Sequence, residues 1–218
     1  ENVVAGDTAV CEVTQTSLRY RGYEIADLAA HACFDEVAYL LLHGELPNVA
    51  ALREFRRRTE ARGREVMAGL GPDQRAFLVV GRPYTTYDAA VNMDIGKKIQ
   101  DLGILAIPLE FLPVDREDVS DAWPNAYSRQ IQKKLAAARL VKRDPRLRAV
   151  VLTYFACGPD SFANPFFKDE IGEPCYVMQI DEHTADAGVI TRMEAFSDTA
   201  GGRDGHEPQR PIRTATLP

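Results

Sequence analysis

Four short apolar runs alternate with helix-like segments between residues 76 and 196, and this alternation constrains the fold more than any other feature. The first run is continuously apolar and is bounded by Asp73 and Gly81, which is typical of a parallel strand covered on both faces. Strands and helices that alternate at this spacing predict βαβ units around a parallel sheet. The four runs are AFLVV (76–80), ILAIPLEFLP (104–113), RAVVLTYF (148–155) and CYVMQI (175–180).

The segments between these runs have helical patterns. We expect one helix over residues 89–103 that ends at Gly103, and a long amphipathic helix over residues 126–144. A helix-forming stretch follows the third run, and AGVITRMEAF after the fourth run predicts a last helix.

The first 66 residues are helix-rich and lack this alternation. A weak alternation over residues 2–14 allows a small hairpin, and a first helix is expected to contain Ile25 and Leu28. FDEVAYLLLHG predicts a second helix that stops at Gly44 in a left-handed conformation. Asn48 is a suitable cap for a third helix.

These patterns divide the chain into three parts. Residues 1–66 form a helical amino-terminal segment, residues 67–198 form an α/β domain, and residues 199–218 form a disordered tail. The tail is rich in Gly, Pro and Arg and has no apolar periodicity.

Charge and cysteine content narrow the classes of function. The net charge is −6 and the isoelectric point is about 5.3, which argues against non-specific binding of nucleic acid or of an anionic membrane. No run approaches the ~20 apolar residues of a membrane span. The four cysteines include no C-x-x-C pair, so we expect reduced thiols in a cytoplasmic protein.

The carboxyl ends of three predicted strands carry unusual residues, in the segments GRPYTTYD, ACGPDSF and DEHTAD. Ligands of parallel sheets gather at the carboxyl ends of the strands. We therefore expect a binding site there. The candidate contacts, with an arginine from the helix that follows, are Arg82, Tyr84, Cys157, Asp160, Ser161, Asp181, His183 and Arg192.

Each candidate also has a structural interpretation, and the sequence leaves both open. Cys157 is a ligand, a nucleophile paired with His183, or a small residue that closes a core strand. Asp181 either contacts a ligand or closes a turn before the last helix. Arg192 either binds a carboxylate or a coenzyme A phosphate, or forms an ion pair. Arg82 and Tyr84 contact a ligand or belong to a structured loop.

The amino-terminal segment resembles citrate and 2-methylcitrate synthases over residues 1–62. The resemblance rests on VVAGDTAV, on LRYRGYEIADLAAHACFDEVAYLLLHGELP and on LREFRRR. In that family the catalytic histidines and aspartate lie far downstream, in a large helical body. His31 and His43 match no catalytic motif position, so the resemblance implies no active site in this segment.

Residues 68–198 resemble the 2-hydroxyacyl-CoA dehydratases and their activase-related proteins. The matching segments include VVGRPYTTYDAAVNMDIGKKI, LVKRDPRLRAVVLTYFACGPDSF and IDEHTADAGVITRMEAF. The resemblance implies a Rossmann-like domain and a [4Fe-4S] cluster with Cys157 as a metal ligand. A cluster requires about four thiolates, so the ligand set in this chain is incomplete.

These resemblances lead to three hypotheses. The first is a component of an iron–sulfur dehydratase system that works by electron transfer and acyl-CoA dehydration, with an acyl-CoA substrate or a dehydratase or activator subunit as partner. The second is a non-catalytic truncated or chimeric fusion product. The third is a citrate synthase-like protein that lacks its catalytic body. We expect the apolar faces of the amino-terminal helices to be poorly covered, for which homo-oligomerisation is one remedy and partial disorder another.

Overall fold

The computed structural model describes residues 11–14, 16–87, 91–154, 157–172, 175–181 and 183–200. These residues fall into two compact units, one up to Thr59 and the other from Glu60. We call them the helical unit and the α/β unit and describe each by itself. The division after Thr59 and the boundary expected at residue 66 both lie within one long helix.

The helical unit begins with a small antiparallel sheet in the order β1-β2-β3. Residues Cys11–Val13 of the first strand pair with residues Leu18–Tyr20 of the second. Cys11–Val13 lie at the end of the segment, residues 2–14, in which a hairpin was expected. Its elements are β1 (Cys11–Val13), β2 (Leu18–Tyr20), β3 (Tyr23–Glu24), α1 (Ile25–His31), α2 (Phe34–His43) and the start of α3 (Val49–Gly69).

The ends of α2 and α3 follow from local chemistry, as the sequence predicts. Gly44 has a φ of 88° and donates its backbone N–H to the carbonyl of Leu40 at 2.8 Å, which closes α2. Asn48 accepts the backbone N–H of Ala51 on its side-chain oxygen at 2.9 Å. This is the bond by which an amino-terminal cap satisfies the first turn of a helix.

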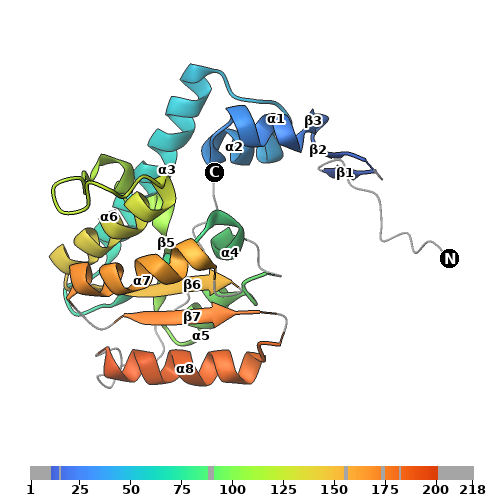
Figure 1. Cartoon of the computed structure of the whole chain (residues 1–218). Coiled ribbons are helices and arrows are strands. Elements are labelled where there is room, and N and C mark those ends of the chain that lie inside the picture. The colour runs from blue at the N-terminus through green and yellow to red at the C-terminus, as the bar shows by residue number, and fades with distance from the viewer. Residues whose placement is uncertain are drawn as a thin grey trace. The chain divides into compact units, whose positions relative to one another are not determined.

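The α/β unit contains a four-stranded sheet in the order β5-β4-β6-β7, in which all pairs are parallel. Helices cover both faces of this sheet (Figure 1). Besides the end of α3, the elements are β4 (Ala76–Val80), α4 (Pro83–Tyr87), α5 (Ile95–Asp101), β5 (Leu105–Pro108), the 3₁₀ turns η1 (Leu109–Phe111) and η2 (Val114–Arg116), α6 (Arg129–Arg143), β6 (Leu147–Tyr154), α7 (Gly158–Ile171), β7 (Tyr176–Ile180) and α8 (Asp186–Thr199).

Alternate residues of the strands build two apolar cores. Leu78 of β4 and Val151 of β6 point into one core with residues of α6 and α7. Phe77 and Val150 point into the other, which is covered by α5 and α8. All residues of β4 are buried, as its continuous apolar run predicts, because a central strand of a doubly covered sheet has no exposed face. The parallel α/β arrangement is therefore confirmed.

The helix expected over residues 89–103 is shorter than predicted. Of its residues, 89 and 90 lie outside the described part, and α5 begins only at Ile95. Met93 and Asp94 have φ values of 57° and 55°, and the side chain of the buried Asn92 accepts the backbone N–H of Ile95 at 3.3 Å. The amide side chain thus stabilises a turn where apolar periodicity alone predicts a helix.

The second run also differs from the prediction, because β5 ends at Pro108 and the chain then turns through η1. The residues expected to form a disordered tail lie outside the described part from residue 201 onward, and Thr199 ends α8. No helix in the described part of the chain is both long and apolar enough to cross a membrane.

Candidate functional site

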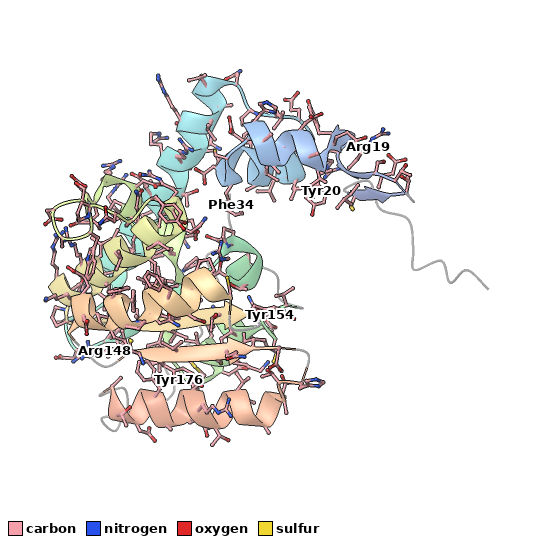
Figure 2. All side chains as sticks on the ribbon, viewed as in Figure 1. Arg19, Tyr20, Phe34, Arg148, Tyr154 and Tyr176 are labelled. Atoms are coloured by element: carbon pink, nitrogen blue, oxygen red, sulfur yellow. The ribbon has the colours of Figure 1, made fainter. Side chains whose placement is uncertain are left out.

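The carboxyl ends of β4, β6 and β7 lie at one edge of the sheet because the three strands are adjacent and parallel. Figure 2 labels Tyr154 at the end of β6 that forms this edge and Arg148 near its other end. The chain passes from β4 outward to β5 and then returns to β6 on the other side of β4. In open α/β sheets, such a reversal of strand order is where ligands bind.

Arg82 and Asp160 meet at this edge, as expected from the strand ends. Arg82 follows β4, and its Nε donates to Oδ2 of Asp160 in the first turn of α7 at 3.0 Å. Gly81, between β4 and Arg82, allows close packing of the turn, because a Cβ atom there would lie 2.8 Å from Thr85 Oγ1 and 3.1 Å from the carbonyl oxygen of Leu152. The ion pair between Arg82 and Asp160 therefore joins the carboxyl end of β4 to the start of α7.

Lys134 of α6 is buried beside this pair, with 5% of its surface exposed. Its ammonium group donates to Oδ1 of Asn164 at 2.5 Å and reaches the backbone oxygen of Asp160 at 3.4 Å. Burial lowers the pKa of Lys134, and the positive charge of Arg82 lowers it further, while the Asp160 carboxylate opposes both effects. The site thus holds a cation whose two hydrogen-bond acceptors in the described part are neutral oxygens.

Thr153 lies next to last in β6 and is 4% exposed. Its position continues the alternation of Ala149 and Val151, which face the core beneath α6 and α7. Within the described residues its hydroxyl has no hydrogen-bond partner. Buried hydroxyl groups are nearly always paired, so this one requires an explanation.

Helix α7 begins at the same edge. Cys157 is its amino-terminal cap residue, and the Cys157 side chain forms no capping hydrogen bond. The backbone N–H of Cys157 donates to the carbonyl of Tyr154 at 3.0 Å, and Ser161 donates its backbone N–H to the carbonyl of Cys157 at 2.8 Å. The Ser161 side chain is exposed. Cys157 thus turns the chain from β6 into α7, which agrees with its structural interpretation.

Asp181, His183 and Thr184 form a turn after β7. Oδ1 of Asp181 accepts the backbone N–H of His183 at 2.9 Å and lies 3.0 Å from the Thr184 hydroxyl oxygen, which donates to it. The backbone N–H of Asp181 in turn donates to the Thr184 hydroxyl at 2.9 Å. These bonds support the interpretation as a turn, although α8 is capped by Ala185 and not by a polar residue.

Of the two remaining candidates, Arg192 does not join the Arg82 cluster, and Tyr84 is not described beyond its backbone. Arg192 is exposed on α8 and forms a hydrogen bond with Tyr176 at the start of β7, which is the opposite edge of the sheet. Burial raises the pKa of Tyr176, and Arg192 opposes this rise. The backbone of Tyr84 belongs to α4, but its side chain lies outside the described part. A ligand role for either residue stays a prediction.

The cysteines do not fit an iron–sulfur cluster. Tyr176 pairs with Val150 and Ile180 pairs with Tyr154, so Cys175 precedes one end of β7 and Cys157 follows the other end of β6. Four strand positions already span about 13 Å. Among the described residues, no three His, Cys, Asp or Glu side chains are grouped to hold a metal ion. Burial also raises the pKa of Cys175, which disfavours the thiolate that a metal requires.

Sequence reasoning missed Lys134, Thr153 and Asn164. A signal existed for the lysine, because Lys134 lies three residues after Ile131 and one before Leu135, on the apolar stripe of the long helix. Thr153 likewise continues the alternating inward positions of its strand. Asn164 gave no signal, because only the packing of α7 against α6 brings it to the lysine.

A pocket of about 250 Å³ lies apart from the Arg82 cluster, between the loop after η2 and the start of α6. Its charged side chains are already paired. Asp115 binds Arg129 and Lys133 at 2.7 and 3.3 Å, and Glu117 binds Arg143 at 2.5 Å. The pocket therefore presents a network that neutralises itself and is the weaker candidate.

Comparison with known proteins points to one family. The family described as "citrate synthase, C-terminal domain" matches residues 1–146. The 2-methylcitrate synthase of Shewanella oneidensis is 50% identical over 54 residues, which are 24% of this chain and 14% of that protein. The citrate synthase of Corynebacterium glutamicum is 63% identical over 38 residues, 17% of this chain and 9% of the relative. The citrate synthase of Acidithiobacillus ferridurans is 38% identical over 93 residues, 42% of this chain and 24% of the relative.

These matches correct one prediction and confirm another. The assignment to dehydratases, activase-related proteins and iron–sulfur proteins is wrong, because the family match and the relatives are citrate and 2-methylcitrate synthases. The resemblance of the amino-terminal segment to that family is confirmed. The chain spans about a quarter or less of the length of these three relatives. With residues 1–146 of its 218 matched, the chain belongs to the citrate synthase family.

Proposed function

We propose that the α/β unit is a Rossmann-like ligand-binding module in a citrate synthase-like protein, with its site at the carboxyl ends of β4 and β6. The observation that carries the proposal is the polar cluster of Arg82, Asp160 and Lys134 at the reversal of strand order. The cluster joins β4, α6 and α7, and two of its three members are buried. Polar groups that converge in an otherwise apolar region are typical of ligand sites.

We also propose that the residues of this chain do not condense acetyl-CoA with oxaloacetate by themselves, because they lack the catalytic body of the family. Condensation requires a general base within hydrogen-bond reach of the reacting carbon. The three histidines of the described part, His31, His43 and His183, are exposed. His43 packs its ring on Tyr39, with centroids 4.1 Å apart, as a helix-terminal residue.

Two measurements test these proposals. Citrate formed from acetyl-CoA and oxaloacetate is followed by ¹H NMR, and we expect none above the background without protein. Ligand binding is followed through the backbone amide signals of the ¹⁵N-labelled chain, with a panel that includes acetate, inorganic phosphate, acetyl-CoA and neutral adenosine. We expect binding to shift the signals of Arg82 and Asp160 and to leave that of Arg192 in place.

Two outcomes contradict the proposals. Citrate formation by the chain alone shows that its residues do build a condensation site. Ligand-induced shifts confined to Arg192 and Tyr176, at the opposite edge of the sheet, show that the site lies elsewhere. The Arg82→Gln variant loses the ion pair with Asp160, and we expect it to bind the ligand more weakly than the wild type does.

The cellular location and the partners of the protein stay predictions. We propose a cytoplasmic location, which the four free cysteines support, because reduced thiols are typical of that compartment. Acyl-CoA binding and homo-oligomerisation also stay predictions. The second is supported by the exposed side chains of Leu42 and Val49 in the helical unit, which are 52% and 67% exposed.

A further inference from the structure

We propose that the site at the carboxyl ends of β4 and β6 recognises an oxyanion group of its ligand, a carboxylate or a phosphate, through Lys134, Thr153 and the amino end of α7. The inference rests on the proposed ligand-binding function and adds the chemical class of the group that is bound. Three independent features of the described structure support it.

The first feature is a buried cation without a buried anion in contact. Lys134 is 5% exposed, and its ammonium group meets the side-chain oxygen of Asn164 and the backbone oxygen of Asp160. Ammonium groups buried among neutral partners are costly, and proteins retain them where a counter-ion or a ligand compensates the charge. Burial is the main cause that lowers the pKa of Lys134, and the nearby Asp160 carboxylate offsets it only in part.

The second feature is the unpartnered hydroxyl of Thr153. This side chain is 4% exposed and faces the α6 and α7 side of the sheet, on which Lys134 also lies. A hydroxyl can donate to an oxyanion without any change of the surrounding structure. An anion between α6 and the end of β6 therefore supplies the partner that the described residues do not.

The third feature is the beginning of α7. This helix has 14 residues, and its cap carries no side-chain hydrogen bond. Its first backbone N–H groups therefore point toward the edge of the sheet, where the helix dipole favours negative charge. Pro159 lacks an N–H, so Gly158 and Asp160 are the donors of this turn.

The charges of the described residues favour a negative group beside Lys134. Among these residues, Arg82 and Lys134 carry positive charge and Asp160 carries negative charge. The carboxylate of Asp160 is held by Arg82 at 3.0 Å. Because Lys134 reaches the backbone oxygen and not the carboxylate of Asp160, its charge remains for the ligand.

Removal of the buried charge separates this role from a structural one. In the Lys134→Met variant the apolar stem is kept and the ammonium is lost. We expect this variant to melt at a higher temperature than the wild type without ligand, and to bind inorganic phosphate or acetate at least about tenfold more weakly. The Lys142→Met variant is the matched control, because Lys142 is exposed on the same helix. It should bind both probes as the wild type does.

The Thr153→Val variant keeps the inference testable if Lys134→Met does not fold. Valine has nearly the shape of threonine, so we expect an unchanged fold and several-fold weaker binding of the same probes. Amide shifts with phosphate but not with acetate identify a phosphate-bearing ligand, and the reverse pattern identifies a carboxylate.

Two results overturn the inference. One is unchanged probe affinity in both Lys134→Met and Thr153→Val. The other is the absence of amide shifts with phosphate and acetate at millimolar concentrations in the wild type. If neutral adenosine still shifts the signals of Arg82 and Asp160, the proposed binding function stands and only the assignment of an anion fails.

Discussion

Replacement of Gly63 by alanine should destabilise the α/β unit, although the same change in an ordinary helix stabilises it. Gly63 lies within α3, where it packs on the backbone of η1. A Cβ atom on Gly63 would lie 1.8 Å from the carbonyl oxygen of Phe111 and 2.7 Å from its carbonyl carbon. Backbone atoms cannot rotate away, so α3 or η1 has to move. Alanine gains about 1 kcal/mol of helix propensity over glycine, while such overpacking costs about 1–3 kcal/mol and occasionally more.

A separation of 1.8 Å from a backbone atom places the overpacking cost in the upper part of this range, at about 2–3 kcal/mol, so we expect Gly63→Ala to lower the free energy of unfolding by about 1–2 kcal/mol. The chain contains a single tryptophan, Trp123, whose indole donates to Glu170 at 3.0 Å within the α/β unit. Urea unfolding followed by its fluorescence therefore reports on this unit. With a slope of about 2 kcal/mol per molar urea, the midpoint should fall by about 0.5–1 M.

Gly69→Ala in the same helix is the control for this prediction. No atom lies within 4 Å of the Cβ position at Gly69, so alanine there should leave the midpoint unchanged or raise it. If Gly63→Ala is as stable as Gly69→Ala, the close packing of α3 on Phe111 is refuted. The placement of α3 from Glu60 onward would then rest on its other contacts, such as the hydrogen bonds from Arg146 to the backbone oxygens of Met67 and Leu70.

Two further substitutions test the interior of this unit. Burial alone would raise the pKa of Glu170, but hydrogen bonds from Trp123 and Arg139 outweigh it and lower the pKa below its ordinary value. Glu170 thus contributes stability above its unfolded pKa that is lost as the pH falls through its folded pKa. Glu170→Gln should therefore lower the urea midpoint more at pH 7 than at pH 3, and equal effects at both would contradict this. Ser197 is 0% exposed and its hydroxyl has no partner among the described residues, so Ser197→Ala should stabilise the fold by about 1 kcal/mol and raise the melting temperature by about 2–4 °C; a lower melting temperature would reveal a hydrogen bond that the serine makes.

Apolar patterns predicted the sheet well because each strand of this unit is buried on both faces. The run at Phe77 and Leu78 has no polar residue, and this distinguishes a central parallel strand from a half-exposed one. The same reasoning failed at residues 91–94, where Asn92 and two residues with positive φ replace a helix. Hydrophobic periodicity does not register such a turn, because the turn depends on one amide side chain.

The candidate site was predicted in part. The rule that ligands gather at strand ends led to Arg82 and Asp160, which do meet. It also led to Arg192, which lies at the opposite edge because α8 runs back along the sheet. Lys134 was missed because a charged residue in a long helix is usually exposed, and its burial depends on the contact of α6 with α7.

Topology explains why Cys157 and Cys175 cannot hold one cluster together. Cys157 and Cys175 are only 18 positions apart in the sequence, and α7 with its flanking residues occupies the interval between them. A helical connection between parallel strands carries the chain from one edge of the sheet to the other. The two thiols therefore lie at opposite edges, which proximity in sequence does not reveal.

The region that matches the citrate synthase family ends inside the α/β unit, before two of the four strands of its sheet. The match ends at residue 146, immediately before β6 begins at Leu147. β6 is the strand that pairs with both β4 and β7, and its residues cover the apolar face of α6. Residues 60–146 by themselves would leave one edge of β4 without hydrogen-bond partners and that helix face exposed. The α/β unit therefore folds only with residues that follow the matched region. Both the hydroxyl of Thr153 and the start of α7, on which the proposed anion site depends, lie in that following part, so the site has to be tested on this chain and not inferred from its relatives.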